Sequence, residues 1–396
     1  MKKHKLKLPA DQVAKEYWNL SPNERTYGKV CELLNIPATV SNQNYLSQLT
    51  REHEIAGLVK HNVLPPRSSG FADRATEYAP LLPELEDMLR RRFGLRDVIS
   101  VNTSDIRQAP DVEWKEKHDD LLHQHLGRWS ARILTSIVRP EDVVATGGGR
   151  GPYYCAHYCT IPPRNTCLKQ VVSLTGDISA RMWRKLPDIT DDNATRGVDA
   201  DHIASLLHSQ LGTKLPPEYL SCAIADRKEG SGHKLKEPKS SDVTVAIVGI
   251  GSLAGGHRLK QEDMFMGQDQ EIQELVKKIN FEVMEVEKDT EPFFHCIGDV
   301  CNYYFVLDRV KDLPNGKSIY ERLNEIVKKI NDRFINTGPE ELTRICKKGA
   351  VIAVAGGPHK IGAIAHVLKQ NETGSPWITH LVTSDEVARS ILKNYG

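Results

Sequence analysis

The sequence predicts an α/β fold with a mostly parallel sheet, preceded by a small all-helical module. Four strongly apolar runs, each ending in glycine, occur at 142–147, 171–176, 243–249 and 351–356, with helical patterns between them. Such runs are typical of parallel strands that are buried on both faces of a sheet. Before residue 65, by contrast, the chain shows only short helical patterns. We therefore expect two structurally different parts.

The boundary between the two parts lies at Leu64–Gly70, where two prolines, two serines and a glycine interrupt the helical patterning. Upstream helical patterns cover 10–20, 22–35, a segment that begins near Thr39 or Ser41, and 50–60. Downstream, we expect helices at 81–93, 114–138 and 361–368 and an additional strand at 98–101. The predicted organisation is a helical module at 1–64, a linker at 65–80 and an α/β domain at 81–396.

Composition narrows the function classes. The 396 residues include 53 Lys and Arg against 52 Asp and Glu, which excludes a protein whose whole surface is basic and coats a polyanion. Residues 1–70, however, contain ten basic and six acidic residues, a net charge of +4, and the rest carries −3. The chain lacks an apolar run long enough to cross a membrane, and its eight cysteines include no CxxC pair. We expect a cytoplasmic protein with reduced cysteines and no metal site.

Two glycine-rich strand ends are candidate anion sites. The backbone N–H groups of Gly147–Gly149 could converge on an anion, and Arg150 could pair with a phosphate through its forked guanidinium. Lys360 follows Gly356–Gly357 in the first turn of a predicted helix, where a cation is unfavourable unless an anion is bound. The alternatives are a tight turn that binds nothing and a solvated lysine. Asp299 could accept hydrogen bonds from sugar hydroxyls or belong to a simple turn.

Six segments, in order, carry a resemblance to a known family: 84–97, 142–150, 248–253, 298–301, 351–360 and 381–389. The most specific is Ala355-Gly356-Gly357-x-x-Lys360, followed by a helix and by a second motif that begins Val382-Thr383. In this order they resemble the SorC family of sugar-responsive bacterial transcription regulators. The resemblance covers about Leu81 to Leu392, most of the chain.

The resemblance implies a Rossmann-like effector domain, related in fold to sugar-phosphate isomerases and deaminases. Such a domain binds a phosphorylated sugar or a similar metabolite without catalysis and forms dimers or tetramers. The effector-binding residues that it implies, together with the residues analysed above, are Gly147, Gly148, Gly149, Arg150, Gly176, Asp177, Gly251, Ser252, Asp299, Gly356, Gly357 and Lys360. No cofactor is implied beyond this effector.

The resemblance also implies an N-terminal helix-turn-helix module that binds operator DNA. Residues 34–42 match the family's LGISxxTVSRLL pattern with one residue fewer. The amides that follow could pair with adenine edges in the major groove. The predicted DNA contacts are Thr39, Ser41, Asn42, Gln43, Asn44, Gln48 and Arg51. A dimerisation or packing module is the alternative for this segment.

Two other functions stay open at this point. The first is a sugar-phosphate isomerase, deaminase or lactonase, in which His257 would be the general base with the help of Asp299. The second is a regulator domain that no longer binds DNA and acts through protein partners. The leading hypothesis is a non-catalytic, ligand-responsive transcription regulator that binds operator DNA and a sugar phosphate as a homo-oligomer.

Overall fold

The computed structural model describes residues 27–35, 81–103, 114–159, 168–175, 199–219, 242–252, 270–287, 296–332 and 337–395. These residues fall into two compact units, of which the first holds 27–35 and the second holds the rest. In the first unit, α2 (Tyr27–Leu33) lies inside the helix predicted at 22–35. The other helices predicted before residue 65, and all seven predicted DNA contacts, lie outside the described residues.

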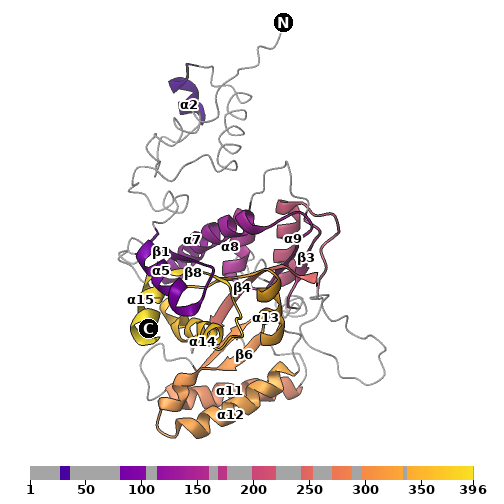
Figure 1. The fold of residues 1–396 in the computed structure, drawn as a ribbon. Coiled ribbons are helices and arrows are strands. Elements are labelled where there is room, and N and C mark those ends of the chain that lie inside the picture. The colour runs from indigo at the N-terminus through magenta and orange to yellow at the C-terminus, as the bar shows by residue number, and fades with distance from the viewer. Residues whose placement is uncertain are drawn as a thin grey trace, which may run out of the picture. The chain divides into compact units, whose positions relative to one another are not determined.

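Six parallel strands form the centre of the second unit (Figure 1). They are β1 (Asp97–Val101), β2 (Val143–Thr146), β3 (Gln170–Ser173), β4 (Val245–Ser252), β7 (Ala350–Val354) and β8 (His380–Ser384). Their order in the sheet is β1-β8-β7-β4-β2-β3, and every neighbouring pair is parallel. All five predicted strands belong to this sheet, which confirms the predicted fold class.

Helices cover both faces of the sheet (Figure 1). On one face lie α7 (Trp114–Ile137), α8 (Arg150–Tyr158) and α9 (Ala200–Leu211), side by side. The other face holds α5 (Pro83–Phe93), α13 (Pro339–Lys348), α14 (Ile361–Glu372) and α15 (Asp385–Tyr395). Gly94 ends α5 in the left-handed conformation, with φ of 62°, as expected for a C-terminal glycine. The helix predicted at 361–368 runs one turn further than expected.

An antiparallel extension grows out of β4. Its last residues, Ile250–Ser252, pair with β5 (Ile297–Val300), which forms a hairpin with β6 (Tyr303–Val306). Both turn residues, Cys301 and Asn302, have positive φ angles of 50° and 59°, as a two-residue type I′ hairpin turn requires. No sequence pattern predicted this hairpin.

Two helices, α11 (Gln270–Glu287) and α12 (Gly316–Asn331), pack on the hairpin together with the short helix η3 (Asp308–Asp312). Their buried side chains make a second core that includes Ile297 and Val306. The hairpin therefore contributes side chains to both the main core and this second core, which fixes the position of β5 relative to the parallel sheet.

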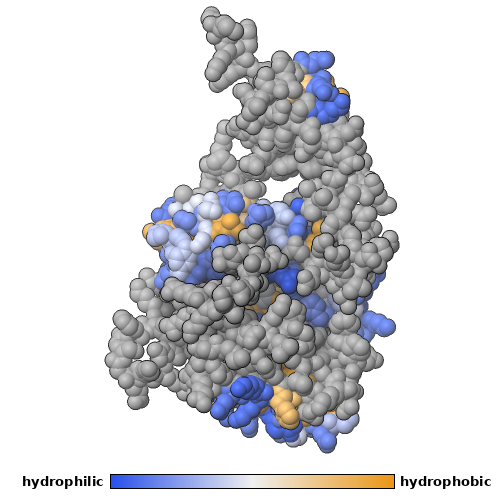
Figure 2. All heavy atoms as spheres, turned by 180° about the vertical axis from the view of Figure 1, so that it is seen from behind, coloured by the Kyte–Doolittle hydropathy of each residue, from blue (hydrophilic) through white to orange (hydrophobic). Residues whose placement is uncertain are grey.

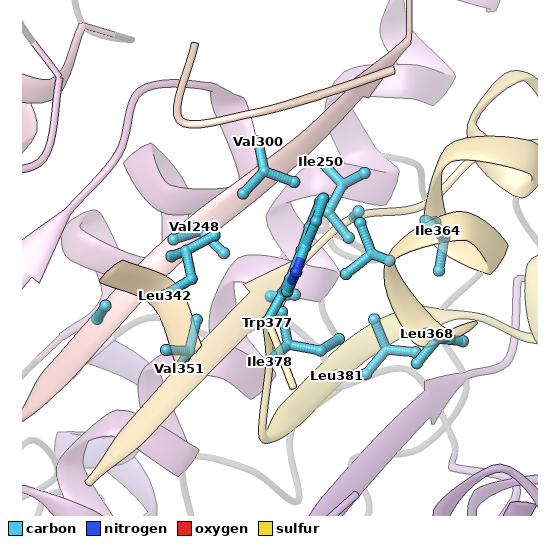
Figure 3. Close-up of a cluster of buried hydrophobic side chains, with 14 of the residues drawn as sticks. Val248, Ile250, Val300, Leu342, Val351, Ile364, Leu368, Trp377, Ile378 and Leu381 are labelled. Atoms are coloured by element: carbon cyan, nitrogen blue, oxygen red, sulfur yellow. The ribbon is translucent and has the colours of Figure 1, made fainter. Parts of the chain in front are cut away.

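The main core holds the strand ends in place. Figure 3 shows Trp377 between side chains of β4, such as Val248 and Ile250, and Ile364 of α14. The indole also meets the ring of Phe305 on β6 edge-on, with centroids 5.7 Å apart. Truncating a buried Trp to Ala removes about 3–5 kcal/mol of stability, so this cluster contributes strongly to the stability of the domain.

The described surface carries few large apolar side chains. Those exposed are Leu33, Met88 and Phe281 on three different helices, and Leu215 and Tyr219 in the segment after α9. Figure 2 shows one face, where the coloured surface is mostly hydrophilic with small, separated hydrophobic areas. Among the described residues, no helix is both long enough and apolar enough to cross a membrane.

Candidate anion-binding site

The candidate site lies at the carboxyl ends of β2, β4 and β7, the three central strands. From β2 the chain continues outward to β3, whereas from β4 it reaches β7 and β8 on the other side. In open α/β sheets, such a reversal of strand order leaves a crevice at the carboxyl edge where ligands bind. The residues of these strand ends that face the edge, Gly148–Arg150, Gly251–Ser252 and Lys360, are partly exposed, whereas the strands below them are buried.

The glycine loop after β2 packs closely against β4. Gly147 donates its N–H to the carbonyl oxygen of Ile247, at 2.9 Å. A Cβ on Gly249 would lie 3.2 Å from the carbonyl oxygen of Gly148, and one on Gly147 would lie 2.9 Å from Sγ of Cys301. These glycines are therefore required by the close approach of the loop to β4 and to the hairpin turn, whether or not an anion binds.

The first turn of α8 crosses from the end of β2 over β4. A Cβ on Gly151 would lie 2.5 Å from the carbonyl oxygen of Val354, so this turn touches the end of β7. Gly149, the N-cap residue, has φ of 114° and supplies no side-chain acceptor, and the first turn contains no acidic residue. The first N–H groups of a helix have no partner within it. They point toward the edge of the sheet, where Arg150 is the first residue of the helix.

A second helix start faces the same edge. After β7, Gly356 and Gly357 lead into the short helix η4 (Pro358–Lys360), and Lys360 is the N-cap residue of α14. Ser252 on β4 holds this connection by donating its hydroxyl to the carbonyl oxygen of His359, at 2.9 Å. As at α8, the first turn of α14 contains no acidic residue and its N-cap side chain makes no capping bond. Two helix starts with cationic residues thus flank the end of β4.

Asp299 supplies the carboxylate of the site. It lies on β5 directly opposite Gly251, and a Cβ on Gly251 would overlap its carboxylate oxygen. Burial raises the pKa of Asp299 from 3.8 to about 6, while the positive charge of Lys360 and the backbone N–H of Asn302 act in the opposite direction. The carboxylate is therefore mostly ionised at neutral pH and interacts with Lys360 across the site.

His123 is a residue that sequence reasoning missed. It lies on α7, only 3% exposed, and burial holds the pKa of its imidazole well below 6.5. The positive charges of Lys360, Arg150 and His359 lower that pKa further, which places His123 close to these three groups. A histidine inside a long helix carries no sequence signal of a site, and α7 contains two others, His118 and His125. The nearest hint is Gly127, one turn later, because glycine is disfavoured inside helices.

The structure brings most of the predicted effector residues to one edge. These are Gly147, Gly148, Gly149, Arg150, Gly251, Ser252, Asp299, Gly356, Gly357 and Lys360. Gly176, Asp177 and His257 lie outside the described residues. Within the described part of the chain, no group of three or more His, Cys, Asp or Glu side chains could hold a metal ion.

Comparison with known proteins gives matches at the level of structure. No protein-family model and no curated protein matches the sequence. The structure is similar to the probable sor operon regulator from Shigella flexneri, with a TM-score of 0.51 and 16% identity over 78% of this chain and 98% of that one. It is also similar to the full-length sorbitol operon regulator SorC from Klebsiella pneumoniae, with a TM-score of 0.50 and 15% identity over 97% of this chain and 99% of that one.

A third similar structure is a domain of a transcriptional repressor from Vibrio fischeri that is assigned to sugar binding. Its TM-score is 0.50 and its identity 17%, over 79% of this chain and 98% of that one. At sequence identities this low, structural similarity is evidence for a shared fold alone. The chain has the fold of SorC-type regulators, as its resemblance to that family predicted.

Proposed function

We propose that this chain is a ligand-responsive transcription regulator. Its α/β domain would bind a phosphorylated sugar or a related metabolite, and its N-terminal module would bind operator DNA. One observation carries the proposal: the two helices that start beside the end of β4, α8 and α14, each have a cationic residue at their start, Arg150 and Lys360, and no acidic residue in the first turn. We call these the basic helix starts. They suit an anion that comes from outside the protein.

The anion-binding half of the site combines three kinds of donor. The first N–H groups of α8 and α14 carry the positive ends of two helix dipoles. Arg150 adds a forked guanidinium and Lys360 a mobile ammonium group. A phosphate group, with its charge spread over three oxygens, matches donors that converge from two helix starts.

The other half of the site suits hydroxyl groups. Asp299 lies close enough to Lys360 for the positive charge of the lysine to lower the pKa of its carboxyl group. A mostly ionised carboxylate accepts hydrogen bonds from sugar hydroxyls. A ligand with a phosphate at one end and hydroxyls at the other would bridge the two halves.

Regulation is favoured over catalysis by the similar structures. They include two operon regulators and a domain of a transcriptional repressor. The enzyme hypothesis depends on His257, which lies outside the described residues.

DNA binding is supported by the charge of +4 on residues 1–70 and by the helix-turn-helix pattern at 34–42. Because one weakly basic module binds DNA poorly, we propose a cytoplasmic homo-oligomer, a dimer or tetramer, in which several modules act together. The effector would shift the equilibrium between arrangements with different operator affinity.

A thermal unfolding screen against phosphorylated sugars, polyols and acids tests the effector half of the proposal. A ligand at 100 times its dissociation constant stabilises the native state by about 2.7 kcal/mol. A gel-shift assay with the promoter region of the protein's own gene, with and without the compound found, tests the DNA half. Stabilisation by no phosphorylated compound would overturn the first half, and turnover of the compound would favour the enzyme.

A further inference from the structure

We propose that His123 is a third anion-contacting side chain of this site, beside Arg150 and Lys360, and that its neutral imidazole donates a hydrogen bond to the phosphate. The inference rests on the proposed function, because it assigns one more ligand contact to the same site. It concerns a residue on α7, an element that none of the sequence motifs includes.

The packing of α7 against α8 places His123 next to Arg150. Both helices start at the carboxyl edge of the sheet, because α8 follows β2 and α7 ends just before β2 begins. They touch where a Cβ on Gly127 would overlap the side chain of Tyr154. Residues four apart lie on the same face of a helix. One turn nearer to the N-terminus of each helix, His123 on α7 therefore lies beside Arg150 on α8.

The same turn of α7 also lies on the loop that leads to Lys360. A Cβ on Gly356 would lie 2.8 Å from Cδ1 of Leu126 and 3.5 Å from Cδ2 of Leu122. These two leucines bracket His123 in the sequence. The imidazole is thus placed between the start of α8 and the helix η4.

The charges around His123 decide which kind of hydrogen-bond donor it can contribute to the site. Burial and three positive neighbours keep its ring neutral. A fourth cation there would be repelled by Arg150, His359 and Lys360, whereas a neutral imidazole still presents an N–H donor. An anion bound between these groups would attract the three cationic side chains and accept a hydrogen bond from the imidazole of His123. Hydrogen bonds to a charged acceptor are stronger than those to a neutral one.

His125 offers a matched control on the same helix. It is equally buried, with 4% of its surface exposed. Two positions along a helix rotate a side chain by about 200°, so His125 points to the opposite flank of α7 from His123. Replacing either histidine removes a buried ring from α7, but only one of them is directed at the basic helix starts.

The experiment measures binding of inorganic phosphate to the full chain by calorimetric titration. His123→Leu should weaken phosphate binding about tenfold or more, which corresponds to about 1.4 kcal/mol. His123→Gln, which keeps an N–H donor, should bind within about threefold of wild type. His125→Leu should bind like wild type. Circular dichroism checks that each variant is folded.

A second measurement covers the case in which His123→Leu does not fold. In the wild-type protein, the ring nitrogen resonances of His123 should move on addition of phosphate, and those of His125 should stay. Ring resonances of His123 that do not move at saturating phosphate would overturn the inference.

The outcomes separate this inference from the proposed function. If Lys360→Met and Arg150→Met lose phosphate binding while His123→Leu keeps it, the anion site stands and the role of His123 is wrong. If the wild-type protein does not bind phosphate, the site itself is wrong and both proposals fall. The same holds if every one of these variants binds phosphate as well as the wild type does.

Discussion

Helices start at the carboxyl edge of the sheet after five of its parallel strands, and the first turns of four of them, α8, α9, α14 and α15, differ in a regular way. The helices after β2 and β7, which flank β4, are the basic helix starts described above. The helices after the next strands outward, β3 and β8, begin with acidic residues: α9 has Asp199 and Asp201, and α15 has Asp385 and Glu386. We call these the acidic helix starts.

At the acidic helix starts, the chain supplies its own counter-charge. Asp199 accepts a hydrogen bond from the backbone N–H of His202 at 2.7 Å. Asp385 accepts from the backbone N–H of Thr103 at 3.1 Å and from its hydroxyl at 2.7 Å. At the basic helix starts no such carboxylate is present in the first turn. The comparison teaches that one fold provides several similar helix-dipole ends, and that the sequence places carboxylates in the first turns at the outer ones but not at the two beside β4.

The largest expected effect concerns Asp299, whose folded-state pKa of about 6 lies above its ordinary 3.8. The native state therefore keeps a proton that the unfolded state releases, so stability falls as the pH rises from about 4 to 6 and stays reduced above that. Asp299→Asn should stabilise the protein by up to about 3 kcal/mol above pH 6 and have little effect below pH 4. Urea unfolding at pH 4 and pH 8 measures the difference in stability between the variant and the wild type. A gain in stability at pH 4 without one at pH 8 would contradict the prediction.

The next largest effect separates the basic helix starts from the rest of the edge. Lys360→Ala and Arg150→Ala should each remove most of the roughly 2.7 kcal/mol of stabilisation that a saturating phosphorylated sugar gives. Unfolding of ligand-free Arg150→Ala should differ little from wild type, because its side chain is partly exposed, whereas ligand-free Lys360→Ala should be less stable above pH 6, because it removes the positive charge beside Asp299. Thermal unfolding with and without the sugar is the measurement. Variants that respond like wild type would place the phosphate elsewhere.

At an acidic helix start the expected pattern is reversed. Asp385→Ala should destabilise the fold by about 2 kcal/mol, because it leaves the buried N–H and hydroxyl of Thr103 without this acceptor. Phosphate affinity should stay as in wild type. A parallel loss of phosphate binding in a folded Asp385→Ala protein would show that the two kinds of helix start are not independent.

The smallest effect is expected at α9. Asp199→Ala removes the N-cap bond to His202 and should cost about 1 kcal/mol of stability. Asp199→Asn, which keeps an acceptor, should recover most of this loss. Chemical denaturation of the pair distinguishes a cap from a general charge effect.

The sequence was informative where the local pattern and the tertiary role agree. Strands such as β2 and β7 are apolar throughout because helices cover both faces of the sheet, so their glycine-rich ends could be found without a structure. The strand β8 was not predicted, although all five of its residues are buried, because His380, Thr383 and Ser384 interrupt the apolar run. The hairpin of β5 and β6 was also missed, since its turn residues, Cys301 and Asn302, include no glycine.

Within the site, sequence reasoning reached the residues that follow strands and missed the one that comes from a helix face. Arg150 and Lys360 stand at fixed positions after strand ends, so topology alone brings them together. His123 reaches the same place only because α7 and α8 cross at Gly127 and Tyr154. Such a crossing depends on the packing of two helices, which no local pattern encodes.

The most direct test of the proposed anion site is a crystal structure of the full chain grown with tungstate, a heavy anion of phosphate-like geometry. We expect a strong density peak between the starts of α8 and α14, within hydrogen-bonding distance of Arg150 and Lys360. A peak at the first turn of α9 or α15, or an empty edge beside β4 at saturating tungstate, would contradict it.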